Sequence, residues 1–384
     1  MKRVIVLGAG RVGGLIARDL KERARLDVTV ADVRPEALKR LEQSFGLSGA
    51  RADLSSPNAV KKLARDFDLA VGAVPGFMGL ATLGAVIEAG ADCCDISFMP
   101  EDPLPLDKAA KKAGVTVVVD CGVAPGLSNM MAGRIASEMN TIDDLTIMVG
   151  GLPKVRTWPY EYKAGFSPID VIEEYTRPAR LVRGGRTVVE PALSGVEPVD
   201  FPGVGTLEAF NSDGLRTLID TIRARNMREM TLRYPGHAEK MRTLRETGLF
   251  GLAPVDVKGA KVRPIDLTTK LLFPMWEMGP GDEDMTVMRV QADGSTGKSN
   301  VTHAYDLLDH YDPSAGATSM SRTTGFTCSI VSAMIASGRY KNPGVVPPEV
   351  LGRDAKLFAK VLGELGNRGV KVAFSKKKAK WLRS

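Results

Sequence analysis

A short apolar segment followed by three spaced glycines opens the chain, and this feature most constrains its fold. Residues 4–7 have the apolar character of a buried strand, and residues 15–20 that of a helix. Between them, Gly8 permits a tight turn, Gly10 lets the backbone approach a pyrophosphate, and Gly13 lets the helix lie close to the strand. The N-terminus of such a helix points free N–H groups at phosphate oxygens. The segment therefore predicts a phosphate-binding turn.

An acidic residue at the end of the next apolar run extends this pattern. Residues 28–32 form a second predicted strand, and Asp32 ends it where a carboxylate would accept the ribose hydroxyls of adenosine. A glycine spacing of this kind is a weak signal alone, but here strand, glycines, helix, strand and acid follow in order. The order predicts a dinucleotide-binding Rossmann unit. A structural glycine turn in another α/β domain is the alternative.

The same pattern predicts the cofactor and its contacts. Asp32 favours NAD over NADP, because its charge would repel a 2′-phosphate, whereas Arg34 keeps NADP open as the less favoured cofactor. Val74 and Pro75 match the place where such a sheet turns towards the nicotinamide ribose. The residues expected to contact the cofactor are Gly8, Gly10, Arg11, Val12, Gly13, Asp32, Val33, Asp53, Leu54, Val74, Pro75 and Gly122.

The composition is that of an ordinary globular protein. A chain of 384 residues suits two or three domains, and 44% hydrophobic with 25% charged residues is typical of a soluble core and surface. The net charge is +7, and we expect the basic residues 376–383 to form a solvated end rather than a nucleic-acid arm. The sequence has no long uninterrupted apolar run, so no transmembrane helix is predicted.

The cysteines and the N-terminus indicate the compartment. Cys93, Cys94, Cys121 and Cys328 lack the spacing of a metal site and are too few for a disulfide framework. The chain leads from Met1 straight into a predicted core strand, which leaves no room for a signal peptide. We therefore expect a cytoplasmic protein without a metal site, and with neither nucleic acid nor a membrane as partner.

Strand and helix signals alternate through the first 122 residues. Helices are predicted over 35–45, 58–67, 77–89 and 106–113, and strands over 50–53, 69–75, 92–97 and 115–119. With the first two strands, they indicate one doubly wound parallel sheet of six strands in an α/β protein.

A different pattern begins after Gly122. A helix is predicted over 127–138, strands over 145–150, 187–189 and 284–291, and a long helix over 319–337. The widely separated strands suit a mixed sheet in an α+β domain. We predict a Rossmann domain over residues 1–122, a substrate-binding or oligomerisation domain over 123–318, and a C-terminal helical segment over 319–384. That last segment is expected to pack back on the Rossmann domain.

From residue 120 onwards, several phrases resemble those of one protein superfamily. They are residues 120–130 (DCGVAPGLSNM), 150–153 (GGLP), 162–168 (YKAGFSP), 210–214 (FNSDG), 231–237 (TLRYPGH), 322–326 (RTTGF) and 344–349 (GVVPPE). In their shared order they resemble the saccharopine dehydrogenase/reductase superfamily, and most of all its NAD-dependent L-lysine 6-dehydrogenase branch. The resemblance implies an amino-acid substrate and a homo-oligomer, either a dimer or a tetramer.

One departure from the family pattern bears on the substrate. In secondary-amine members such as saccharopine reductase, an arginine that grips a carboxylate follows the Ser-Pro of the third phrase, whereas this chain has Ile169. The resemblance then implies oxidation of the ε-amine of L-lysine to a semialdehyde that cyclises, with release of ammonia. A saccharopine or carboxynorspermidine type of secondary-amine dehydrogenase or reductase is one alternative. A non-catalytic NAD-binding regulatory protein is the other.

Amine dehydrogenation requires a group that removes a proton from the ammonium. Asp95 and Ser97 follow a predicted strand, at the edge where doubly wound sheets place ligands. Asp95 is predicted to hold the ammonium or to act as the base, and an acid that only shapes a turn is the alternative. Lys163 is the second predicted base if it is desolvated, and a solvated cation otherwise.

The remaining predicted contacts are with the substrate. Arg233 is the first choice for the α-carboxylate and Arg322 the second, with a structural ion pair as the alternative for each. For the other residues predicted to bind substrate, the alternative is a structural role in core packing, in a turn or in an aromatic core. The residues predicted to bind substrate are Ser97, Cys121, Tyr160, Phe166, Asn211, Asp213, Arg233, His237 and Arg322.

Overall fold

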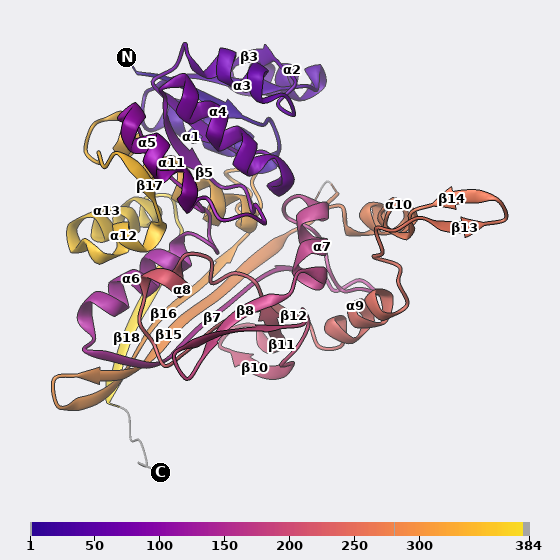
Figure 1. The fold of residues 1–384 in the computed structure, drawn as a ribbon, viewed down its shortest axis with the longest axis vertical. Helices are drawn as coiled ribbons and strands as arrows, with labels where there is room; N and C mark the ends of the chain where they lie inside the picture. The colour runs from indigo at the N-terminus through magenta and orange to yellow at the C-terminus, as the bar shows by residue number, and fades with distance from the viewer. Residues whose placement is uncertain (1, 280, 379–384) are drawn as a thin grey trace. The chain divides into compact units, whose positions relative to one another are not determined.

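The computed structural model describes residues 2–279 and 281–378, and the chain divides into two compact units. Unit 1 comprises Met1–Ser137 and Ser321–Lys371, and unit 2 comprises Glu138–Met320 and Val372–Ser384 (Figure 1). The first unit thus contains residues 127–137 of the helix over 127–138, which the sequence pattern assigned to the second domain. It also receives a segment that is distant in the sequence.

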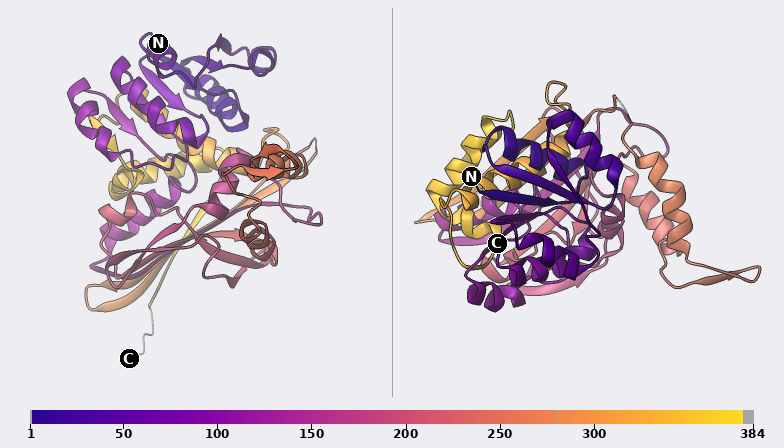
Figure 2. Two further views of the ribbon diagram at one scale, coloured as in Figure 1. Left: turned by 45° about the vertical axis from the view of Figure 1, so that its right-hand side comes forward. Right: turned by 90° about the horizontal axis from the view of Figure 1, so that it is seen from above.

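Unit 1 alternates strands and helices. Its elements are β1 (Arg3–Leu7), α1 (Arg11–Glu22), β2 (Asp27–Asp32), α2 (Pro35–Phe45), β3 (Ser48–Arg51), α3 (Pro57–Ala64), β4 (Leu69–Gly72), α4 (Gly79–Ala89), β5 (Asp92–Asp95), α5 (Asp107–Ala113), β6 (Thr116–Val118), α6 (Leu127–Glu138), α11 (Ser319–Ala336), β17 (Gly344–Val346), α12 (Pro348–Arg353) and α13 (Ala355–Gly366). The strands form one parallel sheet in the order β17-β6-β5-β4-β1-β2-β3, with helices on both faces (Figure 2). The predicted doubly wound sheet is confirmed.

The seventh strand, β17, is absent from the sequence prediction. It is only three residues long, and it pairs with β6 through Val345 and Val117, more than 200 residues earlier in the chain. A run this short carries no periodicity of its own. Only its tertiary partner makes it a strand.

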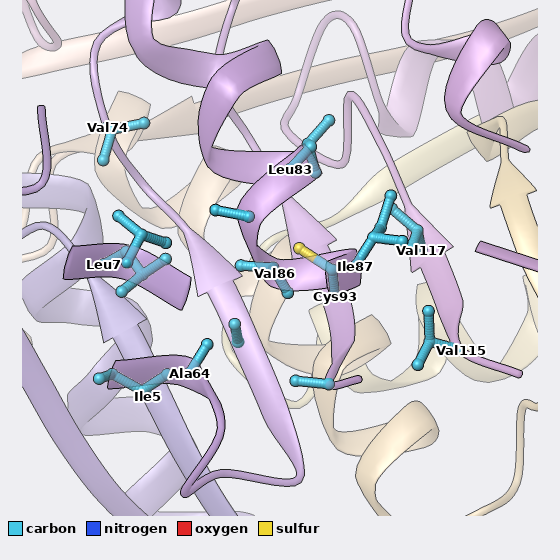
Figure 3. Packing of buried hydrophobic residues seen from close by; sticks show 14 of the residues in the cluster. Ile5, Leu7, Ala64, Val74, Leu83, Val86, Ile87, Cys93, Val115 and Val117 are labelled. Atoms are coloured by element: carbon cyan, nitrogen blue, oxygen red, sulfur yellow. The ribbon is translucent and has the colours of Figure 1, made fainter. Parts of the chain in front are cut away.

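A continuous apolar core covers one face of this sheet. Successive residues of a strand point to opposite faces, so Ile5 and Leu7 of β1 share one face and enter the same buried cluster as Leu83 and Val86 of α4. Figure 3 shows the α4 side chains packed over Cys93 of β5. Because helices cover both faces, the strands are nearly all apolar rather than alternating.

Unit 2 is built on a mixed sheet, as predicted. Its elements are β7 (Thr141–Pro153), α7 (Pro168–Thr176), β8 (Ala179–Arg183), β9 (Arg186–Glu190), β10 (Glu197–Phe201), β11 (Gly205–Ser212), α8 (Leu218–Thr221), β12 (Asn226–Arg233), α9 (His237–Glu246), β13 (Val255–Val257), β14 (Ala260–Val262), α10 (Pro264–Trp276), β15 (Asp284–Thr296), β16 (Ser299–His310) and β18 (Val372–Lys378). The order is β10-β11-β12-β7-β15-β16-β18, with only β12 and β7 parallel along this path.

The C-terminal segment enters both units. In unit 1, Arg368 donates to the Asp19 carboxylate of α1 at 2.9 Å, with both side chains only 5% exposed, and Ser329 of α11 donates to the same carboxylate. Beyond this pair the chain forms β18, which pairs with β16 of unit 2. Lys376, Lys377 and Lys378 therefore lie in an exposed strand at the edge of the described sheet, where lysines discourage further pairing. Residues 379–383, the rest of the predicted solvated end, lie outside the described residues.

None of the helices that the structure describes is long and apolar enough to cross a membrane.

Helices α6 and α12 of unit 1 approach each other through their backbones. A Cβ on Gly133 of α6 would lie 2.2 Å from the carbonyl oxygen of Glu349, and a Cβ on Gly352 of α12 would lie 1.9 Å from that of Met130. Any side chain at these positions forces the two helices apart.

We predict that Gly133→Ala destabilises the protein by about 2 kcal/mol or more, because the added methyl group overlaps backbone atoms. Gly84→Ala, at a half-buried position of α4 where a Cβ would meet nothing within 4 Å, is the matched control. It is expected to be neutral or to stabilise by up to about 1 kcal/mol. Urea denaturation midpoints measure both effects, and equal midpoints for the two variants would contradict this account of the helix contact.

Candidate functional site

The glycine turn between β1 and α1 is determined by two backbone contacts. Gly8 has φ +123°, and a Cβ on it would lie 2.4 Å from the carbonyl oxygen of Ala73. A Cβ on Gly13 would lie 2.1 Å from the carbonyl oxygen of Gly8. These two glycines are therefore required by the packing of strand and helix alone.

Gly10 differs from its neighbours in this respect. Its φ of −71° suits any residue, and a Cβ on it would meet nothing within 4 Å. It is the N-cap of α1, and as a glycine it has no side chain that could cap the first turn of the helix. The protein's own packing thus gives no reason for glycine here, while the close approach of a phosphate to the helix N-terminus does. The residues present fit a bound pyrophosphate.

Asp32, at the end of β2, is held by its surroundings in the charged form. Burial raises its pKa, but hydrogen bonds from the side chain and backbone of Arg34 and from the backbone N–H of Ala9 outweigh this and lower the pKa to about 2. Arg34 places Nε and Nη2 on the two carboxylate oxygens, each at 2.9 Å. Arg34 offsets the charge that would repel a 2′-phosphate. The structure therefore identifies a pyridine nucleotide site without selecting between NAD and NADP.

The other residues predicted to contact the cofactor differ in whether their side chains or only their backbone atoms are accessible to a ligand. Leu54 and Val74 are buried in the core of unit 1, so they would contact a ligand through their backbones. Val33 is 53% exposed, and the exposed Asp53 accepts hydrogen bonds from the backbone and hydroxyl of Ser55. Arg11 and Val12 lie in the first turn of α1, Pro75 follows β4, and Gly122 follows β6.

Asp95 is the acid at the end of β5 and is fully buried. Burial raises its pKa well above the usual range, although the backbone N–H and the hydroxyl of Ser97 both donate to the carboxylate at 2.9 Å. A Cβ on Gly72 would overlap its carboxylate. Asp95 and Ser97 thus form one preorganised, buried pair at the carboxyl edge of the sheet.

Cys121 and Arg322 occupy buried positions in unit 1. The thiol of Cys121 interacts with Cys94, and this contact and burial raise the pKa of the Cys121 thiol. Cys94 lies in turn 3.6 Å from the sulfur of Cys328 on α11. Arg322 donates from Nη2 to the backbone carbonyl of Arg368. The substrate contacts predicted for both residues remain predictions.

Arg233, the predicted carboxylate ligand in unit 2, is part of a buried network. It is 3% exposed, donates to Glu174 of α7 at 2.5 Å, and stacks on the ring of Tyr162 at 4.5 Å. Tyr175 accepts a weaker hydrogen bond from Arg233 Nε at 3.3 Å. Glu174 therefore already balances the charge of Arg233, which is the structural ion pair considered as the alternative.

His237 completes this network at the start of α9. Its Nδ1 donates to the backbone carbonyl of Tyr160, and its Nε2 accepts from the hydroxyl of Tyr175, each at 2.9 Å. Burial, with the charge of Arg233 as the next cause, lowers the pKa of His237 to about 3. The imidazole is therefore a neutral structural link at physiological pH.

The aromatic residues between positions 158 and 166 are divided between the core and the surface. Tyr162 lies in the apolar core of unit 2, and Tyr160 and Phe166 pack against it half-buried. Trp276 of α10 makes edge contacts with both tyrosines. Trp158, by contrast, is 82% exposed. Domain packing accounts for most of this cluster.

The predicted polar contacts of unit 2 have partners within the unit. Asp213 accepts both Nε and Nη2 of Arg180, at 2.8 and 2.9 Å. The amide nitrogen of Asn211 donates to Glu190 and Ser194. Lys163 donates to the backbone carbonyl of Glu277 at 2.9 Å and lies 3.6 Å from Asp282, so its cation has a carboxylate partner.

Glu229 on β12 is a buried acid that the sequence reasoning missed. It is 5% exposed and accepts the Ser212 hydroxyl at 2.6 Å, and burial raises its pKa to about 8. The available signal was polar residues at every second position of the strand, Glu229, Thr231 and Arg233, which places them on one face. Sequence alone does not show that both faces of the strand are covered.

Within the described residues, no cluster of three or more histidine, cysteine or acidic side chains has the arrangement of a metal site.

Two family models match the chain. One is described as the saccharopine dehydrogenase NADP binding domain and matches residues 4–118. The other is described as the saccharopine dehydrogenase C-terminal domain and matches residues 122–370. The parallel sheet and its glycine turn define a Rossmann-type dinucleotide-binding protein with a second, mixed-sheet unit. The chain belongs to the saccharopine dehydrogenase family, which confirms the resemblance to that superfamily, while the branch within it stays a prediction.

Similar proteins cover the chain to different extents. The mitochondrial alpha-aminoadipic semialdehyde synthase of Mus musculus is 26% identical over 264 residues, 65% of this chain but only 28% of that protein. The carboxyaminopropylagmatine dehydrogenase of Synechocystis is 23% identical over 95% of this chain and 96% of its own length. A structure of apo saccharopine dehydrogenase (L-Glu forming) from Saccharomyces cerevisiae superposes with a TM-score of 0.79 at 18% identity, covering 98% and 100% of the chains.

We predict that Gly10→Ala weakens NADH binding at least tenfold, or about 1.4 kcal/mol. The methyl group would occupy space that the phosphate needs, while the ligand-free protein keeps its melting temperature because the fold tolerates a Cβ there. Fluorescence titration and thermal denaturation measure the two effects, with Gly84→Ala as the control. Unchanged affinity would place the nucleotide elsewhere.

Glu229 predicts a pH-dependent stability. Its pKa is about 8 in the folded protein and near the ordinary 4.5 in the unfolded chain, so between these values the folded state holds a proton that the unfolded state has released. The free energy of unfolding therefore falls as pH rises, by up to about 1.4 kcal/mol per pH unit from this group. Glu229→Gln lacks this titration. The difference in free energy of unfolding between Glu229→Gln and wild type is therefore expected to shift in favour of the variant as the pH rises from 5 to 8. The exposed Glu239→Gln is the control, and a pH-independent difference for Glu229→Gln would contradict the assignment.

Proposed function

We propose that this chain is a pyridine-nucleotide-dependent oxidoreductase acting on the C–N bond of an amino-acid amine. The observation that carries the proposal is the glycine turn, in which Gly8 and Gly13 are required by packing and Gly10 leaves room for a phosphate. The family membership and the names of the relatives, a carboxyaminopropylagmatine dehydrogenase and a saccharopine dehydrogenase, support the reaction class.

The proposed reaction converts an amine, water and oxidised nucleotide into a carbonyl compound, ammonia and reduced nucleotide. The nucleotide, when bound, accepts the hydride. Gly10 and the first turn of α1 would hold the pyrophosphate, and Asp32 with Arg34 the adenosine ribose. Asp95 would accept the proton of the substrate ammonium, because burial raises its pKa towards that of a general base and the hydrogen bonds from Ser97 hold the carboxylate in place. Lys163 is the weaker choice, because Asp282 and a carbonyl group hold its ammonium.

L-Lysine is our proposed substrate, with oxidation at the ε-amine. Ile169, half-buried in the first turn of α7, stands where secondary-amine members have an arginine, and the charge of Arg233 is balanced by Glu174. This chain therefore offers fewer arginine side chains for carboxylate binding than the secondary-amine members do. This favours a substrate with one carboxylate over saccharopine, which has three. The product semialdehyde would cyclise to a piperideine carboxylate.

A secondary amine is the second candidate substrate. It is favoured by the relatives that span nearly the whole chain, since saccharopine and carboxyaminopropylagmatine, the compounds in their names, are both secondary amines. We infer NAD as the nucleotide, because the charge of Asp32 would repel a 2′-phosphate. The guanidinium of Arg34 donates two hydrogen bonds to that carboxylate and offsets its charge, so NADP is tested as well.

The test measures formation of reduced nucleotide with NAD and with NADP. L-lysine, L-ornithine, saccharopine and carboxynorspermidine are supplied in turn, and the reverse reaction is run with the corresponding imines. Lysine-dependent formation of NADH, with ammonia released in equal amount, is the expected result. If the enzyme turns over a secondary amine but not lysine, the secondary amine replaces lysine as the proposed substrate.

Asp95→Asn separates catalysis from binding. We expect kcat to fall at least 100-fold, the loss typical of a general base, while NADH affinity stays within about threefold because Asp95 does not hold the pyrophosphate. The variant Asp92→Asn, at the opposite end of β5, is the control. Tight NADH binding by wild type without turnover of any amine would instead support a non-catalytic NAD-binding protein.

A further inference from the structure

Three of the four cysteines lie together inside unit 1. Cys94 is on β5 and Cys328 is on α11, 234 positions later in the sequence, and their sulfur atoms are 3.6 Å apart. Cys121, shortly after β6, forms a hydrogen bond to the sulfur of Cys94. All three residues are fully buried. We call this group of three side chains the thiol cluster.

The fourth cysteine, Cys93, faces away from the thiol cluster although it precedes Cys94 on β5. Successive residues of a strand point to opposite faces of a sheet. The side chain of Cys93 therefore enters the apolar core under α4 (Figure 3), whereas that of Cys94 meets α11 on the other face. The same strand thus offers an equally buried cysteine that packs against apolar side chains instead.

The surroundings of Cys94 favour its thiolate, which is the reactive form of a cysteine. Burial raises the pKa of this thiol, but hydrogen bonds from Cys121, Cys328 and Ser332 outweigh burial and lower the pKa well below its usual range. Burial and the contact with Cys94 raise the pKa of the Cys328 thiol. A thiol that favours the nucleophilic form thus lies beside one that keeps its proton.

We propose that Cys94 and Cys328 are a site of reversible oxidation, at which hydrogen peroxide converts the two thiols into a disulfide bond. The Cys94 thiolate attacks one peroxide oxygen and becomes a sulfenic acid, while the other oxygen leaves as hydroxide and takes up the proton that the thiol had released. The sulfur of Cys328 then displaces hydroxide from the sulfenic acid, and the proton of Cys328 converts that hydroxide into water. In total, two thiols lose two electrons and one peroxide becomes two waters.

The distance between the two sulfur atoms supports this pair. A disulfide bond is about 2.05 Å long, so sulfurs that are 3.6 Å apart must approach each other by about 1.5 Å. Hydrogen peroxide is scarcely larger than water, and local openings of a native structure admit such small molecules to buried groups. The burial of the thiol cluster therefore slows its oxidation without preventing it.

Oxidation at this site is expected to displace the candidate base. Cys94 precedes Asp95 on β5, while α11 is held from its other side by the hydrogen bond that Ser329 donates to Asp19 of α1. A bond between Cys94 and Cys328 therefore pulls the end of β5 towards a helix that is anchored elsewhere. This effect on turnover rests on the proposed function, whereas formation of the disulfide does not.

The first experiment counts thiols in the full chain, denatured after treatment with hydrogen peroxide. Wild type has four thiols and is expected to lose two, with Cys94 and Cys328 linked in the peptides found by mass spectrometry, and to regain both with dithiothreitol. Cys328→Ala is expected to stop at the sulfenic acid of Cys94, which dimedone traps. Cys93→Ala is the matched control, and it should still form the disulfide.

A cooperative thermal transition before oxidation shows that each variant is folded. A wild type that keeps all four thiols, or a disulfide between any other two cysteines, would overturn the proposal. So would a Cys328→Ala variant in which dimedone labels a residue other than Cys94.

The second experiment measures amine turnover before and after oxidation. Wild type and Cys93→Ala are expected to lose at least tenfold in kcat and to recover it with dithiothreitol, because misplacing a catalytic group by about 1 Å can cost on the order of 100-fold in rate. Cys94→Ala should keep its kcat under the same treatment. A disulfide that forms with kcat unchanged would overturn the effect on Asp95. Reduced wild type that turns over no amine would contradict the proposed function, while the thiol count would still decide the oxidation site.

Discussion

The contact between backbones at the glycine turn is the constraint on which the nucleotide site depends. Gly13 touches the carbonyl of Gly8, and Gly8 touches that of Ala73, so α1 is held against β1 and the end of β4 with no side chain between them. This closeness fixes the N-terminus of α1 at the carboxyl edge of the parallel sheet. Asp32 and Asp95 end strands at the same edge, so the turn sets the frame in which all the candidate cofactor groups of unit 1 are arranged.

Unit 2 shows how burial decides between a binding role and a structural role. Arg233, Tyr175 and His237 each satisfy the hydrogen-bonding needs of another member of the group, and Glu174 balances the charge of the arginine. A buried charge without such a partner would cost several kcal/mol. The sequence shows a strongly polar phrase there and suggests ligand contacts, but the tertiary partners account for its polarity without a ligand.

Much of the fold was predictable because its signals are local. The glycine spacing, the apolar strands and the helix boundaries at Pro35 and Phe45 each follow from steric properties of a few neighbouring residues. Strand β17 and the lysines of β18 were not predictable, because their conformation depends on distant pairing partners. For the same reason, Asp213 and Asn211 could be proposed as substrate contacts before Arg180 and Glu190 were seen beside them.

The sequence by itself determined the class of the first unit, the need for a dinucleotide and the family, because these are recorded in short motifs and in their order. Only the tertiary structure decided which charged groups are available. Arg34 occupies the carboxylate of Asp32, Glu174 neutralises Arg233, and Glu229 lies in a buried position that raises its pKa. The physical reason is that desolvation and ion pairing depend on which residues are in contact in the folded protein. The spacing of residues along the chain carries little information about contacts between distant segments.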